Sequence, residues 1–172
     1  FVKVEGLEAR EFRSQKVNIL DHTAIVFNSR NAIEHFFHLC KELRVTLPED
    51  MKYFGISEKV ILYIQKFVQY RKRKVFFGTS GHWPELLTVM AKHKTEKYLF
   101  PLSEGTSLEI AGQLDQKKIK HTECAMFRTV QADLDEDTFK NYDMILIFTP
   151  VGVQSLLSNF PNFNQGDIRL GC

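Results

Sequence analysis

Small and hydroxyl-bearing residues follow five apolar runs of this chain, and each group stands directly before a helical pattern. A helix N-terminus offers unpaired backbone N–H groups and partial positive charge, which suit a carboxylate or a phosphate. Any single group of this kind is explained by ordinary helix capping. Five of them along one sheet edge predict instead a cleft for an anionic ligand. The groups are Asn28-Ser29, Gly55 to Ser57, Gly78 to Gly81, Ser103 to Thr106 and Thr149-Pro150.

The sequence contains no nucleotide-binding or nucleophile motif and no complete set of metal ligands. The group at 78–81 lacks the Lys-Ser/Thr ending of a P-loop, and neither GxGxxG nor GxSxG occurs. His35 and His38 lie three positions apart beside Glu34, but a metal site needs further ligands, so no metal is expected. The basic run 70–74 is interpreted as a solvated edge, with attraction for a polyanion or weak nucleic-acid contact as the alternative.

Apolar runs that alternate with helical patterns must position these groups. Because strands alternating with helices form right-handed βαβ units, the predicted fold class is α/β with a parallel sheet. Such sheets bind ligands at the carboxyl ends of their strands, where the five groups fall. Strands are predicted at 23–27, 51–56, 74–78, 97–101, 121–130 and 144–148, and a further one begins at 168. Helices are predicted at 32–43, 60–67, 84–90, 108–114 and 153–157.

Composition excludes several classes of protein. The 172 residues carry a formal net charge of only +2, which argues against a dedicated nucleic-acid binder. No apolar run approaches the roughly 18 residues of a membrane span. Cys40, Cys124 and Cys172 form no CxxC pair, which indicates a reducing compartment and a cytoplasmic location. The chain opens on Phe1 rather than Met, so targeting signals at its start cannot be read.

An internal repeat suggests two similar lobes. Residues 22–33 align without a gap on 142–153, so that Ser29 falls on Thr149 and Ala32 falls on Gly152. Shared βα patterning is the alternative explanation. The second lobe is incomplete, because one βα unit between 132 and 172 cannot bury its own apolar face. Either chain missing at both ends or a partner completes it, and missing chain is the expectation.

Five segments of the chain resemble motifs of the uroporphyrinogen-III synthase family. They occur in the family's order and spacing and span essentially all 172 residues. Each motif alone is weakly specific, whereas five in sequence are strongly so. The segments are Ile25 to Ile33, Tyr53 to Glu58, Tyr98 to Ser103, Phe127 to Val130 and Ile147 to Val153.

The resemblance implies a fold of two flavodoxin-like parallel-sheet lobes joined by a two-stranded linker. Residues 1–6 would form the first linker strand and 7–122 the complete lobe. Residues 123–131 would form the returning linker strand, and 132–172 would be part of the second lobe.

The resemblance also implies an activity. The family is a hydro-lyase of tetrapyrrole (haem and sirohaem) biosynthesis that cyclises hydroxymethylbilane to uroporphyrinogen III, losing water and inverting the last pyrrole ring. It uses no cofactor and no metal, and it acts chiefly by positioning its substrate. A monomer is expected, with this small-molecule substrate and without nucleic acid or membrane as partners.

Carried onto this chain, the resemblance assigns substrate binding but no catalytic residue. Phe127 would lie in the interlobe cleft, where the family usually has Tyr, and Phe cannot protonate a departing hydroxyl. Val151 stands where the family has Ser. A non-catalytic two-lobed binding protein for a tetrapyrrole or another anion is the alternative, and a receiver-type signalling domain is disfavoured. The expected substrate-binding residues are Ser29, Arg30, Asn31, Ser57, Thr79, Ser103, Thr149, Val151 and Gly152.

Overall fold

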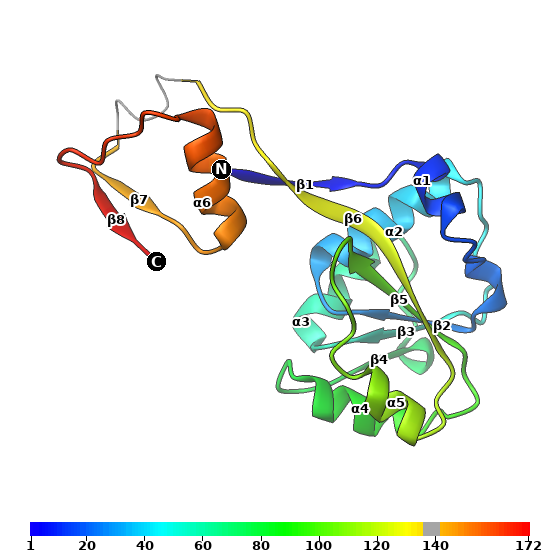
Figure 1. Ribbon diagram of the computed structural model, residues 1–172. Helices are drawn as coiled ribbons and strands as arrows, with labels where there is room; N and C mark the ends of the chain where they lie inside the picture. The colour runs from blue at the N-terminus through cyan, green and yellow to red at the C-terminus, as the bar shows by residue number, and fades with distance from the viewer. Residues whose placement is uncertain (136–141) are drawn as a thin grey trace. The chain divides into compact units, whose positions relative to one another are not determined.

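The chain divides into two compact units in a computed structural model that describes residues 1–135 and 142–172 (Figure 1). Unit 2 is the continuous segment Gly6–Arg128. Unit 1 is built from two segments, Phe1–Glu5 and Thr129–Cys172. Two strands, β1 (Val2–Gly6) and β6 (His121–Gln131), therefore carry the chain out of unit 1 and back into it.

Five parallel strands form the sheet of unit 2. Each neighbouring pair in the order β6-β5-β2-β3-β4 is parallel, and β1 adds to the sheet beside β6. The α/β class and the parallel sheet predicted from the sequence are thus confirmed. Besides β6, the parallel strands are β2 (Ala24–Phe27), β3 (Lys52–Gly55), β4 (Val75–Phe77) and β5 (Tyr98–Ser103).

The strand order departs in one detail from the expected flavodoxin-like pattern. A flavodoxin-like sheet has the order 2-1-3-4-5. Numbered within unit 2, the parallel strands instead run 3-2-1-4-5, so that the first of them, β2, is central. Strands buried on both faces have similar apolar sequences, so the pattern predicts that strands exist without specifying their neighbours.

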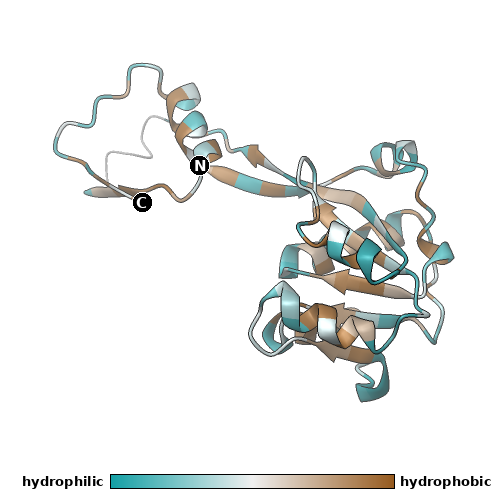
Figure 2. Cartoon of the chain, turned by 60° about the horizontal axis from the view of Figure 1, so that its bottom comes forward, coloured by the Kyte–Doolittle hydropathy of each residue, from teal (hydrophilic) through white to brown (hydrophobic). Residues whose placement is uncertain are grey.

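Helices cover both faces of this sheet. Ile25 and Phe27 of β2 pack into one apolar cluster with the buried stripe of α2, and Ala24 and Val26 pack into a second cluster on the other face. Figure 2 shows the apolar colour concentrated in the strands. The helices are α1 (Ala9–Ser14), α2 (Arg30–Glu42), α3 (Glu58–Ile61), α4 (Trp83–Ala91) and α5 (Ala111–Gln116), with 3-10 turns η1 (Ile19–Asp21), η2 (Leu62–Lys66) and η3 (Lys72–Lys74).

Two helices differ from the sequence prediction. The helix predicted over 60–67 is a single α turn, α3, that continues as the 3-10 turn η2. The helix predicted from residue 108 begins only at Ala111, because Leu108 and Ile110 are buried in the preceding turn. In both places the apolar spacing reports burial rather than α-helical geometry.

Unit 1 contains the parallel pair β7 (Met144–Leu146) and β8 (Arg169–Gly171) and the helix α6 (Pro150–Asn159). The Asn159 side chain ties the incoming chain to α6, since its Nδ2 donates to the Ala132 carbonyl and its Oδ1 accepts from the Leu134 N–H, both at 2.9 Å. Several large apolar side chains of this unit are exposed: Met144, Leu146, Phe148, Leu157 and Leu170.

Candidate functional site

The carboxyl ends of the five parallel strands meet at one edge of unit 2. The strand order reverses at β2, and open α/β sheets bind ligands outside such a reversal. Four of the predicted residues follow or end these strands and so share this carboxyl edge: Ser29, Ser57, Thr79 and Ser103. Phe127 lies within β6, in register with Ser103 at the end of β5. The prediction that all five groups share one sheet edge is wrong for Thr149, because the preceding strand β7 belongs to a separate two-stranded sheet in unit 1. Thr149, Val151 and Gly152 lie at the start of α6.

Three of the predicted hydroxyls are helix caps. Ser29 Oγ accepts from the Ala32 N–H at 3.1 Å, and Ser57 Oγ accepts from the Val60 N–H at 3.3 Å. In unit 1, Thr149 Oγ1 accepts from the Gly152 N–H at 3.2 Å. Capping uses one lone pair of each oxygen and leaves the O–H proton free to donate. Helix capping and carboxylate binding are therefore compatible at each of these positions.

Gly55 fixes the position of the Ser57 cap. A Cβ at this glycine would lie 2.4 Å from Ile61 Cβ and 3.2 Å from the Ser57 carbonyl oxygen. Only glycine therefore lets the first turn of α3 approach the end of β3 so closely. The strand end and the helix start consequently act as one rigid corner.

The turn at Thr79 already holds a carboxylate from its own helix. Glu85 Oε2 accepts from the Thr79 N–H at 2.8 Å, from the Ser80 N–H at 2.7 Å and from the Thr79 hydroxyl at 2.5 Å. These hydrogen bonds lower the pKa of Glu85 to about 2. The hydrogen bond from the Thr79 hydroxyl makes the largest contribution. The turn thus has the geometry to bind a carboxylate, and a ligand would have to displace Glu85 from it.

Ser103 lies where β5 ends, in register with Phe127 of β6. Its carbonyl accepts from both the backbone N–H and the hydroxyl of Thr106, at 3.1 and 2.6 Å, which closes a tight turn. Within the part of the chain that the structure describes, the Ser103 hydroxyl has no hydrogen-bond partner. It is therefore available to a ligand at this edge.

Phe127 is nearly buried, with 7% of its surface exposed, and its ring stacks on the His35 imidazole at a centroid distance of 5.4 Å. Burial lowers the pKa of His35, with a smaller opposing effect from Glu34. The two histidines that the sequence places together thus face different surroundings, because His38 contacts Phe67 instead. His35 supports Phe127 at the carboxyl edge.

Arg30 and Asn31 form the first turn of α2 and are exposed. The Arg30 guanidinium lies over the Tyr63 ring, 5.6 Å from its centroid. The Tyr63 hydroxyl in turn donates to Glu34 at 3.0 Å. This contact holds the Arg30 cation near the start of α2.

Arg128 is a charged residue of this edge that the sequence analysis did not single out. It follows Phe127 on β6 and pairs with Glu11 of α1 and with Glu104 of the loop after β5, with 3.5 Å from its Nε to Glu104 Oε2. The hydrogen bond from Arg128 lowers the pKa of Glu11. The sequence signal for Arg128 is its position beside Phe127, near the end of the strand predicted at 121–130.

Two of the three thiols are buried, and metal binding has no visible basis in residues 1–135 and 142–172. Burial raises the pKa of the Cys40 thiol to about 12 and also raises that of Cys124, so neither thiol ionises readily. No group of three or more metal-ligating side chains comes together in these residues. No helix among them has the length and apolarity to cross a membrane.

These observations define a two-unit α/β protein whose parallel sheet presents hydroxyls, backbone amides and an arginine at one edge. The family described as Uroporphyrinogen-III synthase HemD matches the chain over residues 2–172. The chain therefore belongs to the uroporphyrinogen-III synthase family, as its five sequence motifs predicted.

Two solved structures share the fold of this chain. A mutant uroporphyrinogen III synthase from the extremely thermophilic bacterium Thermus thermophilus superposes with a TM-score of 0.58 at 12% identity, covering 92% of this chain and 65% of that chain. Uroporphyrinogen-III synthetase from Helicobacter pylori gives 0.57 at 12% identity, covering 95% and 71%. The chain thus spans about two thirds of these proteins. A search of curated proteins finds no match.

Proposed function

We propose that this protein is a uroporphyrinogen-III synthase, which cyclises hydroxymethylbilane with loss of water and inversion of the last pyrrole ring. The observation that carries the proposal is family membership over residues 2–172. Two features of the described residues support it. The carboxyl edge of unit 2 gathers hydroxyl donors, and the turn at Thr79 binds a carboxylate, the group that the arms of the substrate bear.

The chemistry asks the protein mainly to position its substrate. The terminal hydroxyl leaves as water after protonation, while the adjacent pyrrole nitrogen supplies electrons to form an azafulvene cation. The last ring's substituted carbon then attacks this cation, and the resulting spiro intermediate reopens and recloses with the ring inverted. Arms held at several fixed points restrict the linear substrate to one conformation, which is how positioning accelerates such a step.

We assign no residue as the proton donor. Phe127 has no hydroxyl, and its ring is covered by His35. Since the pyrrole nitrogen itself expels the leaving group, a synthase without a phenol at this position is expected to be slower rather than inactive.

The direct test is a coupled assay in which hydroxymethylbilane is generated in situ and the product isomers are separated after oxidation. The assay uses the full chain of the protein. Predominance of isomer III supports the synthase. Isomer I alone from a folded protein, the product of unassisted closure, would contradict it and favour the non-catalytic binding protein.

A matched pair of variants tests the proposed binding role of Ser29. Asp and Asn both cap helices about as well as Ser, so Ser29→Asp and Ser29→Asn both keep α2 intact. Only Asp places a negative charge where a substrate carboxylate is proposed to lie. We expect Ser29→Asp to raise KM by about 10-fold or more, and Ser29→Asn to leave it within about 3-fold. Equal KM values for the two variants would refute this role.

We also propose that the protein acts as a cytoplasmic monomer without cofactor, metal or nucleic acid. Three cysteines, all free in the structure, support a reducing compartment, and the small net charge argues against a nucleic-acid partner. Light scattering coupled to size-exclusion chromatography tests the oligomeric state, and a dimer mass at micromolar concentration would refute this part.

A further inference from the structure

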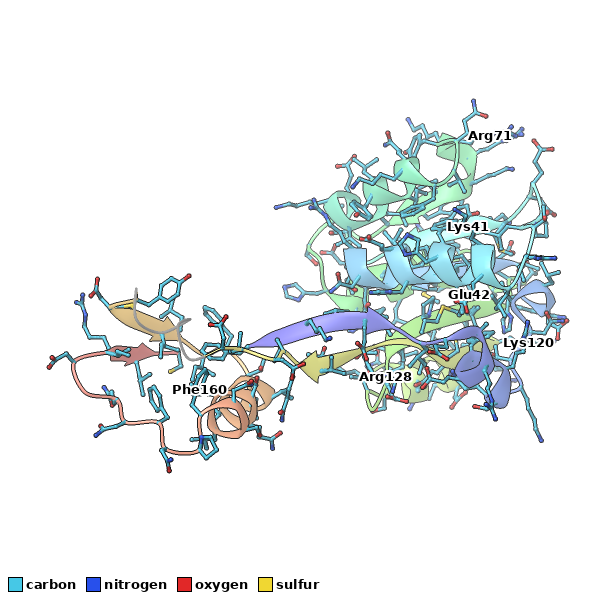
Figure 3. The ribbon with its side chains drawn as sticks, turned by 90° about the horizontal axis from the view of Figure 1, so that it is seen from above. Lys41, Glu42, Arg71, Lys120, Arg128 and Phe160 are labelled. Carbon is cyan, nitrogen blue, oxygen red and sulfur yellow. The ribbon has the colours of Figure 1, made fainter. Side chains whose placement is uncertain are left out.

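The amino-terminal edge of the unit 2 sheet, opposite the carboxyl edge, is rich in basic residues. The segments 70–74, 92–97 and 117–121 lead into β4, β5 and β6, and basic side chains outnumber acidic ones in each of them. In Figure 3, Arg71 and Lys120 both lie at this end of the unit, whereas Arg128 lies toward the other end of β6. This edge is therefore positively charged, although the net charge of the whole chain is small.

A cavity of about 360 Å³ opens in this edge. Three lysines from three separate segments line it: Lys16 after α1, Lys97 before β5 and Lys120 before β6. Its volume lies in the lower part of the range of small-molecule sites. Convergence of three cations on one hollow concentrates positive potential there more strongly than a flat basic surface does.

Two oriented histidines line the same cavity. His22 Nδ1 lies 2.9 Å from the Asn18 carbonyl oxygen, and His121 Nδ1 lies 3.1 Å from the Ile119 carbonyl oxygen. A backbone carbonyl at Nδ1 fixes each ring and leaves Nε2 for another partner. Because a carbonyl oxygen only accepts, each Nδ1 carries a proton, so Nε2 donates to a phosphate oxygen only when the ring is doubly protonated.

Acidic side chains near the cavity are already engaged. Asp21, which lines it, accepts a hydrogen bond from Asn18 Nδ2 at 2.9 Å, and the largely exposed Asp115 lies 3.9 Å from His121 Nδ1. One lining carboxylate against three lysines leaves the cavity positively charged. The lining contains lysine and no arginine, and lysine binds phosphate as a compact point charge.

We propose that this cavity binds a small molecule bearing phosphate groups, at a site separate from the carboxyl edge. The six residues of β5 span about 20 Å between the two edges of the sheet. A ligand held by Lys97 and Lys120 therefore does not reach the hydroxyls of the carboxyl edge. The proposal does not depend on the synthase activity.

Calorimetric titration of the full chain with inorganic pyrophosphate tests the proposal, in phosphate-free buffer at fixed ionic strength. Lys97→Gln with Lys120→Gln removes two lining charges. Lys72→Gln with Arg73→Gln is the matched control, because it removes the same charge from the same edge outside the cavity. We expect the first pair to weaken binding about 10-fold or more and the control pair to change it less than about 3-fold.

Three results would overturn the proposal: no pyrophosphate binding by the wild type, equal weakening in both variant pairs, or citrate binding as tight as pyrophosphate. Far-UV circular dichroism establishes that the variants fold. A second measurement needs no variant: pyrophosphate should shift the imidazole NMR resonances of His22 and His121 and leave those of the distant His38 unchanged. Unchanged resonances of His22 and His121 would likewise refute it.

Discussion

Replacement of Gly55 by alanine tests whether the corner between β3 and α3 is as tight as the structure indicates. The added Cβ would lie 2.4 Å from Ile61 Cβ and 3.1 Å from Ile61 Cγ1. Carbon atoms in contact normally lie about 3.5–4.0 Å apart, so the overlap exceeds about 1 Å. Because the clashing Ile61 atom is a Cβ, a change of side-chain rotamer cannot relieve it. The backbone of α3 must move instead.

Two opposing effects set the size of the change in stability. Overpacking of a core contact costs about 1–3 kcal/mol. Alanine also restricts the unfolded chain, which stabilises the folded state by about 0.4–1 kcal/mol. We therefore expect Gly55→Ala to lower the free energy of unfolding by about 1–2 kcal/mol. For a chain of this size, that is a fall in Tm of about 2–8 °C.

Gly112→Ala is the matched control for this experiment. Gly112 lies in α5, and a Cβ there would meet no atom within 4 Å. The same substitution should thus stabilise the protein, by about 0.5–1 kcal/mol, because alanine favours the helix. Thermal and urea unfolding measure both variants. If Gly55→Ala were as stable as the wild type, or stabilised like Gly112→Ala, the corner would not be constrained as we describe.

Three further predictions concern other contacts. Asn159→Ala should lower the stability of unit 1 by about 1–2 kcal/mol, because it leaves the Leu134 N–H and the Ala132 carbonyl without their partner. Urea unfolding measures the loss, and an unchanged midpoint would contradict the prediction. Under the proposed function, Arg128→Gln should lower kcat/KM by about 10-fold through loss of a cation at the carboxyl edge, and unchanged kinetics would exclude Arg128 from substrate binding. The pKa of Glu85 is about 2 in the folded state and 4.5 ordinarily, so its stabilising effect is present above about pH 4.5 and lost as the pH falls toward 2. The stability difference between wild type and Glu85→Gln should shrink across that range in thermal unfolding, and a constant difference would refute the assignment.

The sheet could be predicted because its strands are short apolar runs with sharp ends. All four residues of β2 are buried, and polar Asn28 ends the run, so the sequence marks both its existence and its extent. The helix α1 gave no such signal. It is six residues long and buries only Phe12, and its start depends on Glu8 and Glu11 and on Glu42, which accepts a hydrogen bond from the Ala9 N–H. The contact to Glu42 joins residues 33 positions apart, which local patterns do not reveal.

Some residues of the candidate site could likewise be predicted from the sequence, and others could not. Ser29, Ser57 and Ser103 could be predicted, because a hydroxyl directly after an apolar run falls at the carboxyl edge in any parallel sheet. The partners of Arg128 and the hydrogen bonds of Glu85 could not. They depend on register between strands and on the rotamer of one glutamate, neither of which leaves a periodic signal in the sequence.

The composition of unit 1 from two separate segments has a consequence for folding during synthesis. Residues 6–128 are continuous and leave the ribosome before residues 129–172, so unit 2 can form while unit 1 still lacks most of its chain. Folding of unit 2 then brings its own ends together, as the hydrogen bond from the Leu7 N–H to the Met126 carbonyl at 2.9 Å indicates. Closing a flexible loop of that length would otherwise cost on the order of 4 kcal/mol in chain entropy. Folded unit 2 thus brings together the two segments from which unit 1 is built. Destabilising unit 2 should therefore also delay the assembly of unit 1.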